Sequence, residues 1–139
     1  MKVPQRLVFT TLTLMMVTTM FGGVVLAHHG RSGYGSDDTI VTMEGVVAQV
    51  MWRNPHVFVV YNVTDHNGDA VRWMGEFSSV QSMMSEGMSR TGFKAGDEIR
   101  VTTLPAASGS PHGLVIKIET LDGSVSVDLS ARRGGIRAR

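Results

Sequence analysis

The sequence predicts a mainly β protein, a small five-stranded Greek-key barrel similar to the oligonucleotide/oligosaccharide-binding (OB) type, with one short helix between strands 3 and 4. Two observations predict this fold. Short segments of alternating apolar and polar residues are separated by glycine-rich turns. A helical spacing of apolar residues occurs once, between the third and fourth of these segments. A small β-sandwich with an incidental helix is the alternative.

The first strand is predicted over residues 40–52, where apolar and polar side chains alternate. Gly45 interrupts the alternation, and a glycine inside a strand commonly marks a bulge or a sharp bend. A helix is predicted over 78–88, because serine and glycine flank a run with helical spacing. The later strands are predicted over 98–104, 114–121 and 125–129.

Residues 57–64 and 70–77 are predicted to form a hairpin whose register follows from the pattern. If Gly68 is left-handed in a three-residue loop, Asp65 faces Asp69, and valine and aromatic side chains share one face. A slip of one residue would bring charged side chains of the second strand to that face, where a charge without a partner is costly. We therefore expect the first register.

Residues 1–27 have the pattern of a cleaved secretory signal peptide. Two basic residues lie near its start, an apolar stretch fills residues 7–26, and Val25 and Ala27 occupy the small-residue positions before a cut. A retained anchor is the alternative, since about 20 apolar residues can span a bilayer, but five threonines and a glycine pair disfavour it. We expect a periplasmic or secreted protein with no permanent membrane anchor.

The remaining chain divides by composition into an N-terminal arm (28–38), a β-barrel domain (39–130) and a basic tail (131–139) that we expect to be disordered. Residues 28–130 contain seven basic and 12 acidic side chains. A body of that charge is a poor nucleic-acid binder, because such binding depends on neutralising phosphates. The chain has no cysteine, so neither disulfides nor thiolate metal sites are available.

The strongest chemical feature arises from the predicted cleavage. A cut after Ala27 makes His28 the first residue, and a terminal amine beside an imidazole can chelate one metal through both nitrogens. Nitrogen donors of this kind suit Cu(II). His29 follows directly and is a further candidate ligand.

The predicted partners of this chelate are His56 and Glu76. In the expected hairpin register they are diagonal neighbours on one outer face, close enough to share a site. The same face carries Phe58, Val60 and Met74, which are too apolar to be left bare, and the arm is the nearest segment that could cover them. The alternative is that His56 is a strand-end residue bonded to the backbone.

Other candidate ligands have simpler interpretations. His66 is expected to be a solvated turn residue, and His112, in the predicted loop 105–113, is only an outside candidate for a further ligand. Methionine is the adaptable filler of irregular cores, so we interpret the methionines as core residues rather than Cu(I) ligands. They are Met43, Met51, Met74, Met83, Met84 and Met88.

The sequence also resembles a family of small exported bacterial proteins of uncharacterised function. The resemblance covers residues 27–123, and its most specific element is the Trp-x-Asn-Pro-His string at 52–56. It implies export and a barrel-like domain, and it supplies no activity. Two positions depart from the family pattern, Gly30 in the arm and the stretch 87–90 after the helix, where an aromatic contact is missing. The matching segments are Ala27-His28-His29, Glu44-Gly45, Trp52-x-Asn54-Pro55-His56-Val57, Asn67-Gly68, Trp73 with Glu76, and Gly96-Asp97.

Three functions are compatible with these features. The first is a periplasmic copper-binding protein with His28, His29, His56 and Glu76 as ligands. The second is an OB-like binding module that holds a glycan, peptide or protein partner through Trp52, Tyr34 and Phe58 without a metal. An enzyme ranks last: copper bound by an N-terminal histidine can support oxidative chemistry, but a domain this small offers no evident substrate cleft. The sequence also contains no Ser-His-Asp order, phosphate loop or zinc motif.

Overall fold

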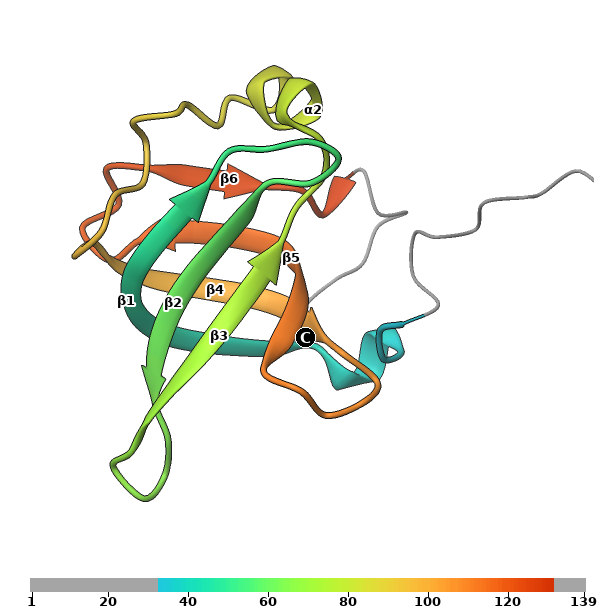
Figure 1. Ribbon diagram of the computed structural model, residues 1–139, viewed down its shortest axis with the longest axis vertical. Coiled ribbons are helices and arrows are strands. Elements are labelled where there is room, and N and C mark those ends of the chain that lie inside the picture. The colour runs from blue at the N-terminus through green and yellow to red at the C-terminus, as the bar shows by residue number, and fades with distance from the viewer. Residues whose placement is uncertain (1–32, 132–139) are drawn as a thin grey trace, which may run out of the picture. The chain divides into compact units, whose positions relative to one another are not determined.

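The computed structural model describes residues 33–131 and has the predicted fold, a closed five-stranded β-barrel with one strand outside it (Figure 1). The strands follow the order β3-β2-β1-β4-β5-β6, and a parallel pairing of β3 with β5 closes the barrel. This is the Greek-key order of the OB type. The strands are β1 (Val41–Met51), β2 (Phe58–Thr64), β3 (Ala70–Glu76), β4 (Glu98–Pro105), β5 (His112–Thr120) and the outside strand β6 (Ser126–Asp128).

The β2–β3 hairpin has the predicted register. Tyr61 lies opposite Trp73, and the backbone N–H of Asp65 donates to the carbonyl of Asp69 at 2.9 Å. Gly68 has a φ of 92°, the left-handed conformation that the three-residue loop requires. The predicted register is therefore confirmed, and it keeps the apolar side chains of both strands on the inner face.

The predicted irregularity of β1 is present, but at a different residue. The register with β2 shifts between Val47 and Gln49, so the bulge lies at Ala48 rather than at Gly45. As a result Val47 points into the core, whereas Val46 is 42% exposed. Gly45 instead allows β1 and β2 to approach closely, since a Cβ there would lie 2.5 Å from the carbonyl oxygen of Asn62.

The predicted helix is present between β3 and β4 as α2 (Val80–Ser85), and it is shorter than expected. Ser79 caps it by accepting a hydrogen bond from the N–H of Ser82, and the left-handed Gly87 follows its last turn. Met83 is buried in the core as predicted, whereas Met84 on the same helix is 57% exposed.

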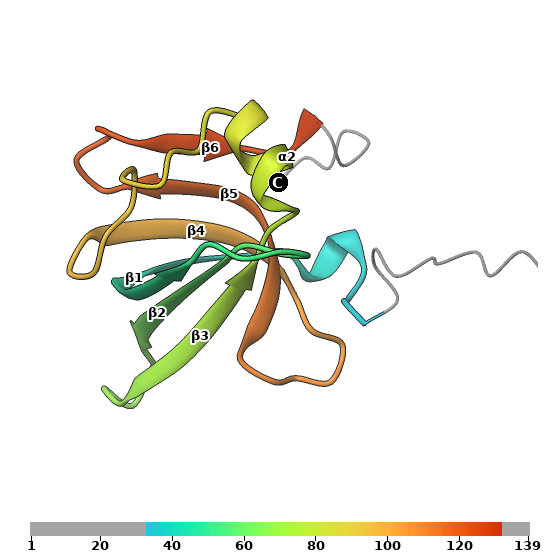
Figure 2. The ribbon, with the colours of Figure 1, turned by 45° about the horizontal axis from the view of Figure 1, so that its top comes forward.

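The core has two parts. The larger part fills the barrel interior and includes Tyr61, whose burial raises the pKa of its hydroxyl. The smaller part contains Leu104, Leu114 and Ile116 of β4 and β5, and the arm residue Tyr34 packs against it together with Ile40. Figure 2 shows the described part of the arm, with the short 3-10 turn η1 (Asp37–Thr39), beside the β4–β5 loop.

Several predictions concern residues outside the described range. The signal peptide (1–27), His28 and His29, and the tail from residue 132 onward belong to this group. Within residues 33–131, no helix has the length and apolar character that a membrane crossing requires.

Candidate functional site

Four polar side chains from separate parts of the fold meet beside the end of β3. Glu76 is the last residue of β3, His56 lies in the β1–β2 loop, His112 begins β5, and Tyr34 belongs to the arm. We refer to Tyr34, His56, Glu76 and His112 as the Glu76 cluster. Sequence reasoning predicted that His56 and Glu76 would be neighbours, and the structure brings them together.

The Glu76 carboxylate is the centre of the cluster. Its Oε1 contacts Nδ1 of His56, while its Oε2 accepts a hydrogen bond from the Tyr34 hydroxyl and lies 3.1 Å from Nε2 of His112. The Tyr34 hydroxyl is also 3.3 Å from that nitrogen of His112. The carboxylate side chain is only 14% exposed, so these contacts replace most of its hydration.

Two strand pairings assemble the cluster. In the β2–β3 pairing Glu76 faces Phe58, which leaves His56 diagonally across from it. In the parallel β3–β5 pairing Met74 faces His112 and Glu76 faces Leu114, so His112 reaches Glu76 from the other side. The backbone N–H of Met74 donates to the carbonyl of Pro111 at 3.0 Å and holds the start of β5 in this position.

These contacts define what each imidazole can do. A neutral His56 that donates its Nδ1–H to Glu76 keeps a lone pair on Nε2 for a metal or for another donor. His112 uses Nε2 in the same way, which leaves its lone pair on Nδ1. The cluster therefore presents two imidazoles that one carboxylate orients.

The described residues do not form a complete metal site by themselves. Within the range 33–131, no group of three or more histidine, aspartate or glutamate side chains is arranged to hold a metal ion. The predicted ligands His28 and His29 lie outside the described residues.

Sequence reasoning underestimated His112 and gave Tyr34 a different role. His112 was expected in a loop, but it starts β5 and contacts Glu76. The signal that could have found it is the closing strand of an OB barrel, which pairs with β3 and so passes beside Glu76. His66, in contrast, is exposed in the β2–β3 turn as predicted.

The aromatic residues considered for a binding module lie close to the cluster. The guanidinium of Arg53 is 5.3 Å from the ring centre of Phe58, and that of Arg90 is 5.4 Å from the ring of Trp52. Both rings are half-buried. They flank the β1–β2 loop, and the ring centre of Phe58 lies 6.3 Å from that of His56.

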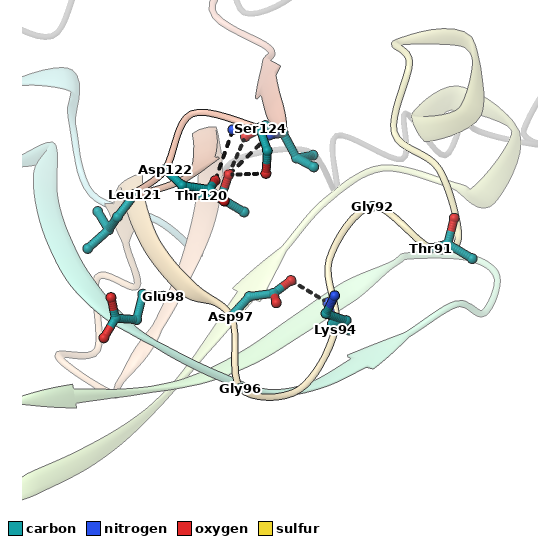
Figure 3. Close-up of a pocket in the computed structure, with 11 residues that line it drawn as sticks. Thr91, Gly92, Lys94, Gly96, Asp97, Glu98, Thr120, Leu121, Asp122 and Ser124 are labelled. Carbon is teal, nitrogen blue, oxygen red and sulfur yellow. Dashed lines mark hydrogen bonds between the residues drawn. The ribbon is translucent and has the colours of Figure 1, made fainter.

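A separate hollow lies at the other end of β4 and β5, between the 91–98 loop and the turn after β5 (Figure 3). Its volume is about 440 Å³, and it includes no residue of the Glu76 cluster. Two of its carboxylates, those of Asp97 and Asp122, accept hydrogen bonds within their own loops. The carboxylate of Asp97 accepts from the N–H of Lys94, and hydrogen bonds from the Thr120 side chain and the Ser124 N–H lower the pKa of Asp122 to about 2.

The fold and the cluster together define a small OB-type barrel with a histidine–carboxylate cluster at its β1–β2 and β4–β5 loops. The chain belongs to a family of unknown function, DUF6152, whose model matches residues 17–117. The match supports the predicted relationship to an uncharacterised family. No curated protein and no solved structure matches the chain.

Proposed function

We propose that this protein is exported to the periplasm, is cleaved after Ala27, and binds copper through the amine and imidazole of His28 and the imidazole of His56. His29 is a candidate for a further nitrogen ligand. The observation that carries the proposal is the hydrogen bond from Tyr34 to Glu76, since Glu76 also contacts His56. The first described residues of the arm therefore lie at the predicted metal ligand.

The distance along the chain is compatible with this arrangement. Tyr34 is six positions after His28 in the sequence, with five residues between them. An extended chain advances by about 3.3 to 3.6 Å per residue, so this segment can span up to about 20 Å. The proposal requires the segment to turn back toward His56, and the glycines at 30 and 33 make such a turn easy.

The chemistry of the cluster favours a metal held by nitrogen. Histidine ligands commonly donate their other ring N–H to a carboxylate, which fixes the tautomer and the ring orientation. Glu76 supplies this contact to Nδ1 of His56. Because both oxygens of Glu76 are already engaged, we assign it the orientation of His56 rather than direct coordination.

The test is a copper titration of the exported protein, followed by electron paramagnetic resonance. We expect one Cu(II) per chain, bound more tightly than micromolar, with hyperfine coupling to nitrogen. His56→Ala should weaken binding at least about tenfold, which corresponds to about 1.4 kcal/mol. The matched variant His66→Ala should bind normally, because His66 is exposed in a turn away from the cluster.

Two results would contradict the proposal. Wild-type protein that binds copper no more tightly than micromolar would exclude the copper function. Equal losses in His56→Ala and His66→Ala would show that any copper bound is held by exposed imidazoles without a specific site.

The second candidate is a metal-free binding module, and the position of the cluster favours it. OB barrels bind oligosaccharides and oligonucleotides through the face of strands 2 and 3 and through the β1–β2 and β4–β5 loops. Trp52 lies in the β1–β2 loop, Phe58 begins β2, and the arm residue Tyr34 bridges Ala106 at the start of the β4–β5 loop. Binding of a glycan or peptide with unchanged affinity in the presence of a chelator, and its loss in Phe58→Ala, would support this candidate instead.

A further inference from the structure

We infer that the Tyr34 hydroxyl is the positioning group that fastens the arm to the barrel at the Glu76 cluster. In this role Tyr34 is not itself a metal ligand. It holds the arm where a ligand from the arm can reach a metal ion bound at His56. The effect on the arm is independent of the metal. The effect on copper binding rests on the proposed function.

In residues 33–38, the described part of the arm, backbone pairing with the barrel is slight. It consists there of one isolated bridge between Tyr34 and Ala106, with two hydrogen bonds beside it. The N–H of Gly35 donates to Pro105 at 2.9 Å, and the N–H of Ala107 donates to Gly33 at 3.0 Å. A bridge of this size is marginal without side-chain support, since even an isolated two-stranded hairpin is marginally stable in water.

The Tyr34 side chain supplies that support in two ways. Its ring packs against the smaller core cluster of Leu104, Leu114 and Ile116, and its edge meets the ring of His112 at a centroid distance of 5.5 Å. Its hydroxyl then donates to the partly buried carboxylate of Glu76. A phenylalanine ring would make the same apolar contacts without this hydrogen bond, so Tyr34→Phe isolates the contribution of the hydroxyl.

The shared carboxylate links the arm to the ligand side chain. The oxygen that accepts from Tyr34 and the oxygen that contacts His56 belong to the same group. If copper bridges the arm and His56, it binds only the attached arrangement. Copper must then raise the equilibrium constant for attachment of the arm, and attachment must raise the affinity for copper by the same factor.

The test is amide hydrogen exchange, measured by NMR on the full exported protein in the wild type and in Tyr34→Phe. Gly35 and Ala107 report directly, because their N–H groups make the two arm hydrogen bonds. We expect their protection in Tyr34→Phe to fall about tenfold or more, as the loss of a hydrogen bond to a charged group predicts. The N–H of Asp65, bonded to Asp69 in the distant hairpin turn, should keep its protection.

The matched control is Ser36→Ala, which removes another hydroxyl from the arm. Ser36 contacts the carboxylate of Asp38 within the arm itself, so its loss should leave the protection of Gly35 and Ala107 unchanged. Unchanged protection in Tyr34→Phe would overturn the inference. An equal loss at Asp65 would overturn it as well, because the variant would then be destabilised as a whole.

Adding Cu(II) separates this inference from the proposed function. Because Cu(II) broadens nearby NMR signals, the exchange takes place with the metal present, and the metal is removed by a chelator after quenching and before the spectra are recorded. If both are correct, copper raises the protection of Gly35 and Ala107 in the wild type and in Tyr34→Phe, with the same nitrogen signals in the resonance spectrum of each protein. If Tyr34→Phe lowers protection but the wild type binds no copper, the copper function is refuted, and the positioning of the arm by Tyr34 is established.

Discussion

Close packing of β5 against β4, beside the seam where β5 pairs with β3, depends on Gly113, and Gly113→Ala tests this packing. Gly113 pairs with Gly75 in the parallel β3–β5 ladder, one residue after His112. A Cβ at Gly113 would lie 2.2 Å from Oγ1 and 3.0 Å from Cγ2 of Thr103, and 3.2 Å from the carbonyl oxygen of Leu104. Thr103 is fully buried, so its side chain cannot move into solvent.

The magnitude follows from two opposing effects. Overfilling a well-packed core costs about 1 to 3 kcal/mol, while replacing glycine by alanine reduces the entropy of the unfolded chain and recovers about 0.4 to 1 kcal/mol. The net destabilisation of Gly113→Ala should therefore be about 1 to 2 kcal/mol. In a domain of this size, that loss corresponds to a decrease in Tm of about 5 to 15 °C.

The assay is thermal unfolding of Gly113→Ala, Thr103→Ala and the double variant. Within residues 33–131, Oγ1 of Thr103 has no hydrogen-bonding partner, so Thr103→Ala removes the clash without breaking a bond. The double variant should be no less stable than Thr103→Ala alone. Gly33→Ala is the control, because no atom lies within 4 Å of its Cβ position. Additive losses in the double variant would refute the argument.

Three further predictions concern the cluster, the processing of the chain and the distant hollow. Glu76→Gln should weaken copper binding about 10- to 100-fold in a calorimetric titration, because His56 loses its orienting carboxylate, and unchanged affinity would contradict that role. Mass spectrometry of exported protein should show a chain that begins at His28, whereas a retained Met1 would remove the amine ligand. Because the pKa of Asp122 is lowered from 3.8 to about 2, the stability contributed by its ionised form is present above pH 4 and is lost as the pH falls toward 2. Asp122→Asn should flatten the acid unfolding curve in that window, and parallel curves for both proteins would contradict the assignment.

The β2–β3 hairpin could be predicted from the sequence because side chains alternate across a strand. A single correct residue pair fixes every other pair, and only one register kept charged residues off the inner face. The contact between His56 and Glu76 was predictable for the same reason, since both residues flank this hairpin. Local periodicity and turn chemistry were therefore sufficient for this half of the site.

The bulge of β1 could not be located in the same way. Gly45 was the obvious breaker, but the extra residue is Ala48, where β1 leaves β4 and follows β2. The bulge depends on which strand lies on each edge of β1, and the pattern of one strand does not contain that information.

The other half of the cluster depends on contacts between distant parts of the chain. His112 reaches Glu76 through the parallel β3–β5 pairing, and Tyr34 reaches it from the arm, where its backbone bridges Ala106 and its ring packs on β4 and β5. Neither pairing leaves a periodic signal near the residues involved. Sequence reasoning therefore placed His112 in a loop and considered Tyr34 only as an aromatic contact.

The difference between local and long-range contacts has a physical consequence for the Glu76 cluster. The contact between His56 and Glu76 belongs to a local hairpin, whereas His112 and Tyr34 join the carboxylate only after the barrel has closed. Forcing β5 away from β4 at Gly113, beside the closing seam, should therefore loosen His112 and Tyr34 first and leave His56 beside Glu76. If the arm carries the metal-binding amine, copper affinity depends on barrel closure even though Gly113 touches no proposed ligand. Copper would then stabilise the closed barrel as well as the attached arm, because it binds only the state in which both are formed.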